Sequence, residues 1–143
     1  MRRSYNKYRV APVSRRTSSE GERFDSRAEM LRFQELQLLE KSGAIADLRK
    51  QVSYPLILPN GVPIKIRSAG FPNGRQCVYT ADAVYRETES GEEIVEDTKS
   101  PATMTGESKL RIAIWEAVTG RRVRINLAGG RQGKSNGKTK SRR

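Results

Sequence analysis

The sequence contains no histidine and a single cysteine, Cys77, and these shortages exclude several kinds of active site. A zinc site built from cysteine and histidine needs more ligands than the chain offers. Nucleophiles activated by histidine are excluded, as are nucleases with a histidine base, and a disulfide within the chain is impossible. Any bound metal must therefore be held mainly by oxygen atoms, which favours Mg²⁺, Mn²⁺ or Ca²⁺.

Long apolar runs are also lacking. No stretch of 18 apolar residues is present, so the sequence predicts no membrane-spanning helix and no membrane partner. The first residues lack the apolar segment of a signal peptide. We therefore expect a cytoplasmic protein, and its 143 residues suffice for one domain with one core.

Acidic residues are missing from both ends of a chain whose net charge is +12. Residues 1–16 and residues 128–143 each carry six lysines and arginines and no acid, whereas the middle of the chain is balanced. Such a distribution predicts two electrostatic arms on a neutral domain, with a nucleic-acid backbone as partner. The cations of these ends that we expect to contact nucleic acid are Arg2, Arg3, Arg15, Arg16, Arg131 and Lys134.

Turn and helix signals divide the chain into a basic arm (1–24), a domain (25–127) and a basic tail (128–143). A helix is expected over 26–41, with Ser26 as its N-cap and Gly43 as its stop signal, and a second over 107–118, ended by Gly120. Residues 68–74 look like a loop. Strands are expected over 49–58, 62–67, 76–86, 92–99 and 121–127. This order predicts an α/β class of fold, a mixed sheet flanked by helices.

The hairpin over residues 76–99 carries the strongest chemical signal. A turn at 88–91 pairs Glu87 with Glu92 and therefore places Asp82 opposite Asp97. Opposite residues share a face with Cβ atoms about 4.5–5.5 Å apart, and alternation adds Lys99 to that face. Two like charges that face each other destabilise a hairpin unless a cation lies between them. Carboxylates hold Mg²⁺ in proteins, so the hairpin predicts a Mg²⁺ site.

Each of these residues also has a simpler interpretation. On a helical wheel Glu29 lies between Phe33 and Leu36, so it can face the sheet and complete a metal site, or it can be the second half of a capping box with Ser26. Asp97 and Lys99 can belong to a solvated, charged hairpin, because residues 87–97 contain six acids. The acid-x-lysine pattern also occurs at Glu107-Ser108-Lys109, at the start of a helix.

Several segments together resemble a small family of phage-encoded PD-(D/E)XK nuclease-like proteins of resolvase-like role. The similarity covers about residues 22–125, and the order and spacing of its segments are more specific than acid-x-lysine alone. One departure is Ser100-Pro101, where the family usually has a glycine. The segments are Phe24-Asp25-Ser26-Arg27-Ala28-Glu29, Leu38 to Ile45, Leu48-Arg49-Lys50-Gln51, Tyr79-Thr80-Ala81-Asp82 and Ile94 to Ser100.

The resemblance implies an αβββαβ core and a metal-dependent DNA endonuclease with Glu29, Asp82, Asp97 and Lys99 as catalytic residues. Mg²⁺, with Mn²⁺ able to replace it, would be held by Asp82, Asp97, Glu29 and the Thr98 carbonyl. Lys109 and Arg111 on the following helix would contact phosphate.

The family also suggests branched DNA as the substrate, as for a Holliday junction resolvase in phage recombination, replication or packaging inside an infected host. Cutting both strands symmetrically would need a homodimer. Two alternatives remain at this point: a nucleic-acid-binding protein that keeps the fold without catalysis, and a nickase or end-processing nuclease without branch specificity.

Overall fold

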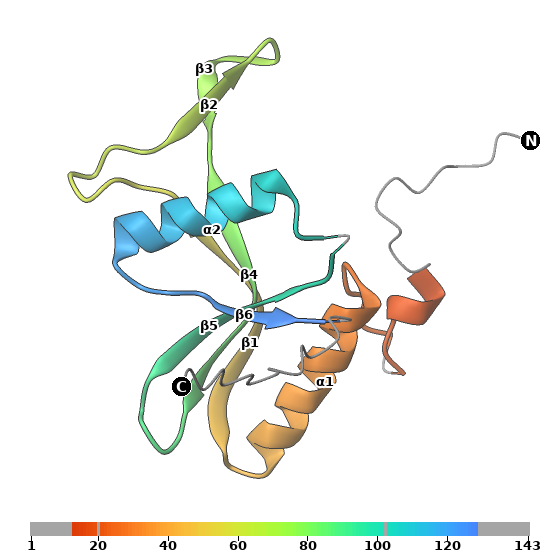
Figure 1. Cartoon of the computed structure of the whole chain (residues 1–143). Helices are drawn as coiled ribbons and strands as arrows, with labels where there is room; N and C mark the ends of the chain where they lie inside the picture. The colour runs from red at the N-terminus through yellow and green to blue at the C-terminus, as the bar shows by residue number, and fades with distance from the viewer. Residues whose placement is uncertain (1–12, 20, 102, 129–143) are drawn as a thin grey trace, which may run out of the picture.

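The computed structural model describes residues 13–19, 21–101 and 103–128 (Figure 1). A short 3-10 helix, η1 (Val13–Arg16), precedes the first long helix. The remaining elements are α1 (Arg27–Lys41), β1 (Ile45–Pro55), β2 (Lys65–Ser68), β3 (Phe71–Gln76), β4 (Val78–Glu87), β5 (Glu93–Lys99), α2 (Gly106–Thr119) and β6 (Arg124–Leu127).

The core of the fold is a four-stranded sheet with the order β1-β4-β5-β6. The pairs β1–β4 and β4–β5 are antiparallel, whereas β5 and β6 are parallel and are connected through α2. The sheet is therefore mixed, as the sequence predicted, and the fold is of the mixed α and β class.

The two helices cover opposite faces of this sheet. Side chains of α1, among them Phe33 and Leu36, pack against Tyr85 and Ile94. Trp115 of α2 packs on the other face, in the cluster that contains Val84 and Val95. Neighbouring strand residues thus serve different cores, as period-two alternation requires. Tyr85 and Ile94 lie directly opposite each other in the β4–β5 pair.

The helix ends follow the sequence signals. The Ser26 side chain accepts a hydrogen bond from the Glu29 N–H at the start of α1, and Thr105 caps α2 in the same way through the Ser108 N–H. Gly120 has a φ of 69° and ends α2 in the left-handed region, where glycine is favoured. The expected ends of both helices are confirmed to within one residue.

The segment predicted to be a loop contains a strand. Residues 71–76 form β3, which pairs with β2 in a separate two-stranded sheet. Pro72 and Gly74 suggested a loop, but Gly74 is needed for packing: with a φ of 93°, a Cβ there would lie 2.8 Å from the Cβ of Lys65. β1 also begins earlier than predicted, at Ile45 rather than Arg49, and ends at Pro55.

Contacts of the domain reach back to η1, although the sequence placed residues 1–24 in a basic arm. The Arg16 Nη1 donates a hydrogen bond to the Phe24 carbonyl at 2.9 Å. Phe24 itself is 2% exposed and packs against Phe33, with ring centroids 5.7 Å apart. Within the described residues, no helix is both long and apolar enough to cross a membrane.

Candidate active site

The alternation of side chains between the two faces of the sheet is interrupted in β1, and the candidate site lies at this point. Leu48 packs with the α1 cluster and the Lys50 Nζ lies over Phe24, yet Val52 packs with the α2 cluster. Residues two apart in a regular strand share a face. Gln51, between them, has a φ of 50°, and this left-handed residue makes the switch.

β4 makes the same switch at Asp82, the position facing Gln51. Ala81 belongs to the α2 cluster and Ala83 to the α1 cluster, although they are two residues apart. The β1–β4 register pairs Lys50 with Ala83 and Val52 with Ala81, so Gln51 and Asp82 occupy the position between. Asp82 is therefore placed between the two layers instead of belonging to either core.

β4 and β5 stop pairing at this same level. Their ladder runs from Arg86 with Glu93 to Ala83 with Glu96, and beyond it β4 continues beside β1 while β5 continues beside β6. The Glu87 N–H donates to the Glu92 carbonyl, so the predicted turn is correct. Asp82 and Asp97 are the next residues after the last pair. Asp82 Oδ2 accepts a hydrogen bond of 2.8 Å from the Thr98 N–H, which holds the strands at this fork.

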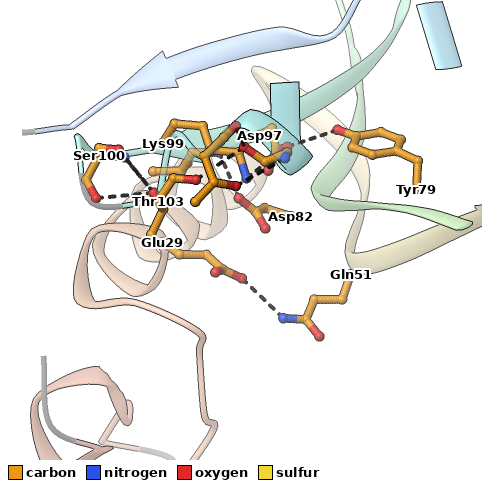
Figure 2. Close-up of polar contacts among 11 residues, drawn as sticks. Glu29, Gln51, Tyr79, Asp82, Asp97, Lys99, Ser100 and Thr103 are labelled. Atoms are coloured by element: carbon orange, nitrogen blue, oxygen red, sulfur yellow. Dashed lines mark hydrogen bonds and ion pairs between the residues drawn. The ribbon is translucent and has the colours of Figure 1, made fainter. Parts of the chain in front are cut away.

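Asp97 is buried on β5, with 2% of its surface exposed. Its Oδ2 accepts a hydrogen bond from the Tyr79 hydroxyl at 3.2 Å and lies 3.4 Å from the Lys99 Nζ (Figure 2). Its Oδ1 is buried and has no hydrogen-bond partner among the described residues. These contacts contradict the interpretation of Asp97 and Lys99 as part of a solvated hairpin.

The surroundings of Asp82 alter its protonation. Burial raises the pKa of Asp82 to about 9, and the neighbouring Asp97 carboxylate acts in the same direction, while the hydrogen bond from the Thr98 N–H opposes them. Asp82 therefore carries a proton at neutral pH when no cation is bound. Burial, followed by the Asp97 charge, also raises the pKa of Tyr79, so its hydroxyl remains a donor.

Glu29 comes from the first turn of α1 and is 5% exposed. Its Oε1 accepts a hydrogen bond of 3.2 Å from the Gln51 Nε2, and the two side chains point toward one another in Figure 2. Burial, followed by the charges of Asp25 and Asp97, raises the pKa of Glu29, while Gln51 lowers it. In the described part of the chain only the Ser26 half of the predicted capping box is formed, because the Glu29 carboxylate bonds to Gln51.

The loop after β5 closes on itself beside Lys99. The Ser100 N–H donates to the Thr103 Oγ1 at 2.8 Å, and the two hydroxyl groups lie 3.2 Å apart (Figure 2). Ser100-Pro101, which departs from the resembling family, thus forms a hydrogen-bonded turn at the end of the strand.

The structure brings Glu29, Asp82, Asp97 and Lys99 together from three elements, with Thr98 joined to Asp82. Among the described residues, however, no group of three acidic, cysteine or histidine side chains is close enough to hold a metal ion by itself. Asp82 and Asp97 are the two candidate ligands that the fork brings level, and Glu29 lines the same small pocket as Asp82.

The cations predicted to bind nucleic acid have different surroundings. Lys109 and Arg15 are exposed. Arg111 donates to the Val78 carbonyl and to Glu107, and Arg16 donates to the carbonyls of Phe24 and Asp25, so each also has a structural role. Four of the predicted residues lie outside the described part of the chain: Arg2, Arg3, Arg131 and Lys134.

Two residues at the site had no role in the sequence prediction. Tyr79 is part of a segment quoted for the resemblance, but it was given no role of its own. Gln51 also belongs to such a segment, and nothing local predicts that a glutamine adopts a positive φ. Its position opposite Asp82 depends on the register of β1 against β4, which the sequence did not specify.

Residues 5–120 match a family described as "Protein of unknown function (DUF1064)". The chain belongs to this family. No match was found among curated proteins or among solved structures. What this DUF1064 protein does must therefore be inferred from the arrangement of its own residues.

Proposed function

We propose that this protein is a metal-dependent endonuclease of the PD-(D/E)XK type that hydrolyses phosphodiester bonds in DNA. The observation that carries the proposal is the meeting of Asp82 and Asp97 at the fork between β4 and β5, with Lys99 beside Asp97. A buried and a half-buried carboxylate next to a lysine, with a third carboxylate on a helix, combine oxygen ligands with positive charge. Phosphodiester hydrolysis requires both.

The residues present fit a divalent cation. Asp97 Oδ1 is buried without a hydrogen-bond partner among the described residues, and Asp82 retains a proton that a cation would replace. Mg²⁺ is usually held by one or two carboxylates, with water and phosphate oxygens completing its shell. Two aspartates are therefore enough, and Glu29 would act through water.

The chain's own residues have separable tasks in this scheme. Mg²⁺, when bound, would polarise the scissile phosphate and stabilise its developing charge. Lys99 would orient the attacking water and add positive charge beside the phosphate. Tyr79 holds Asp97 through Oδ2, and Gln51 holds Glu29 through Oε1. Hydrolysis then forms a bond from the water oxygen to phosphorus and breaks the bond from phosphorus to the leaving sugar oxygen. The attacking water gives up a proton to solvent, and the sugar oxygen takes one up.

DNA is the proposed partner because the excess positive charge lies at the two ends of the chain. Arms of this kind supply affinity for phosphate without sequence preference. Within this proposal we favour branched DNA as the substrate and a homodimer as the active form, both from the family resemblance.

Cleavage by the purified full-length protein tests the function. A four-way junction and a linear duplex with the same arm sequences would be incubated with Mg²⁺, with Ca²⁺ or with EDTA. Cutting of the junction with Mg²⁺ and not with EDTA is the expected result. Equal cutting of both substrates would support the nuclease and overturn the branch preference. DNA binding without cutting, even with Mn²⁺, would contradict the nuclease and favour a binding protein.

A further inference from the structure

The β2–β3 hairpin is the part of the molecule that the proposed site leaves unexplained. It forms its own two-stranded sheet and stands away from the rest of the fold at the end of β4 (Figure 1). All of β2 is exposed, and so is β3 apart from Gly74. A hairpin with so little buried surface contributes little to the core. Packing therefore does not explain why the hairpin is present, and a binding role does.

The charge of this region has one sign. From Leu48 to Ala81 the sequence has no acidic residue, and the five charged residues there are all basic: Arg49, Lys50, Lys65, Arg67 and Arg75. The three cations on or beside the hairpin, Lys65, Arg67 and Arg75, are exposed. None of these three cations forms an ion pair within the described part of the chain, whereas Arg49 pairs with Glu93 and Lys50 with Glu22. The hairpin surface therefore suits an anionic partner.

One face of the hairpin forms a groove with α2. Its volume is about 380 Å³, and its lining includes Ile66, Phe71 and Arg75 from the hairpin and Arg111 from α2. Ile66 pairs with Arg75, and Ser68 with Phe71, so these side chains share a face of the ribbon. Arg111 reaches the β4 end of the groove, where it donates to the Val78 carbonyl at 2.9 Å and to the exposed Glu107 carboxylate at 2.7 Å.

An aromatic ring is available in this groove. Phe71 remains 49% exposed at the tip of the hairpin, next to the two-residue turn, and Ile66 is 60% exposed. The Arg75 guanidinium lies 5.5 Å from the centre of the Phe71 ring. A half-exposed aromatic ring beside a guanidinium group is a combination by which proteins bind single strands, with a base on the ring and phosphates on the cations.

We propose that the groove between the β2–β3 hairpin and α2 binds an unpaired stretch of DNA, with a base stacked on Phe71 and the strand's phosphates on Arg75 and Arg111. The groove lies at the Val78 end of β4, about 13 Å along the strand from Asp82. The inference rests on the proposed nuclease and deepens it: a substrate with an unpaired segment near the cut would be held in place.

Binding of a fluorescent single-stranded oligonucleotide to the full chain in EDTA tests the proposal separately from cleavage. Phe71→Ala should weaken binding about tenfold through loss of stacking. Arg75→Gln should weaken binding and lower the dependence of log K on log salt by about 0.7. Arg67→Gln removes the same charge from the same hairpin but outside the groove lining, so its affinity should stay within about twofold of the unaltered protein.

The result that would overturn the proposal is equal binding by Phe71→Ala and the unaltered protein, or equal losses in Arg75→Gln and Arg67→Gln. A second copy of the chain is the other possible occupant of the groove, and sedimentation tests for it. A dimer that dissociates in Phe71→Ala would show that the second copy fills the groove. If the protein bound the single strand in EDTA but cut no DNA, the groove would be supported and the nuclease function contradicted. If the protein cut DNA and Phe71→Ala changed neither binding nor cutting, the nuclease would be supported and the groove contradicted.

Discussion

The Thr98 N–H donates a hydrogen bond to Asp82 Oδ2 at 2.8 Å, and this bond joins β4 to β5 where their ladder has already ended. A side chain thus takes the place of a backbone acceptor. The arrangement keeps the strands together while leaving room between them for two carboxylates. It explains how the two strands stay joined beyond their last backbone pair.

The metal-free protein should become less stable as pH rises, because Asp82 keeps a proton in the folded state that it loses in the unfolded state. The pKa of Asp82 is about 9 in the folded protein, raised from an ordinary value of 3.8 by burial and then by Asp97. The stability that this proton provides is complete below pH 3.8 and is lost as pH rises toward 9, at about 1.4 kcal/mol per unit at most. Melting in EDTA between pH 5 and 9 measures it, and Asp82→Asn should flatten the curve. A flat curve for the unaltered protein would contradict the assigned protonation.

Cation binding should release a proton for the same reason. A cation that takes the place of the Asp82 proton binds more tightly as pH rises from 7 to 9. Calorimetric titration with Mn²⁺ in two buffers of different ionisation enthalpy should show release of about one proton at pH 7. Binding whose heat is the same in both buffers would count against Asp82 as a ligand.

A comparison of Tyr79→Phe with Tyr85→Phe should show whether Tyr79 positions Asp97 for cleavage in addition to stabilising the fold. Tyr79 donates to Asp97, whereas Tyr85 donates to Glu96 in the α1 layer, at 3.2 and 2.9 Å respectively. Each variant should lose about 1–3 kcal/mol of unfolding free energy. Only Tyr79→Phe should also lower the cleavage rate, by about tenfold. Equal cleavage rates in the two variants would refute the positioning role of Tyr79.

Gln51→Ala should lower the cleavage rate about tenfold, because Glu29 loses the amide that orients its carboxylate. The loss of unfolding free energy should be only about 1 kcal/mol, since the hydrogen bond is partly exposed. Thr80→Ala is a control on the same sheet, because it removes a hydroxyl bonded to Ser53 at 3.0 Å and away from the carboxylates. If both variants cleaved at the unaltered rate, Glu29 would not belong to the site.

Arg32→Ala should be strongly destabilising. Arg32 donates two hydrogen bonds of 2.9 Å to Glu96, which is 1% exposed. Removing the arginine leaves a buried carboxylate without its ion pair, which costs about 3–5 kcal/mol. Urea unfolding measures this loss, and the double variant Arg32→Met with Glu96→Met should recover most of it. A single variant within 1 kcal/mol of the unaltered protein would contradict this role.

Much of the site could be predicted from the sequence because it depends on short-range geometry. The turn at 88–91 determines the register in which Asp82 lies opposite Asp97, and helical periodicity places Glu29 toward the sheet. The switch of faces at Gln51 and Asp82 could not be predicted, because a positive φ at glutamine results from tertiary context rather than local preference. β3 was missed because a glycine that permits close packing looks like a turn glycine. Tyr79 was missed because its ring packs in the core, and only its hydroxyl reaches Asp97.

The rate of junction cleavage by Asp97→Asn tests the central claim most directly. Glu92→Gln, an exposed residue near the turn of the same hairpin, is the matched control because it removes the same charge. We expect Asp97→Asn to lose Mg²⁺-dependent cleavage by at least a thousandfold, while it still binds DNA. Glu92→Gln should cut at the unaltered rate. Cleavage by Asp97→Asn at a rate close to that of the control would contradict the assignment of Asp97, and with it the proposed active site.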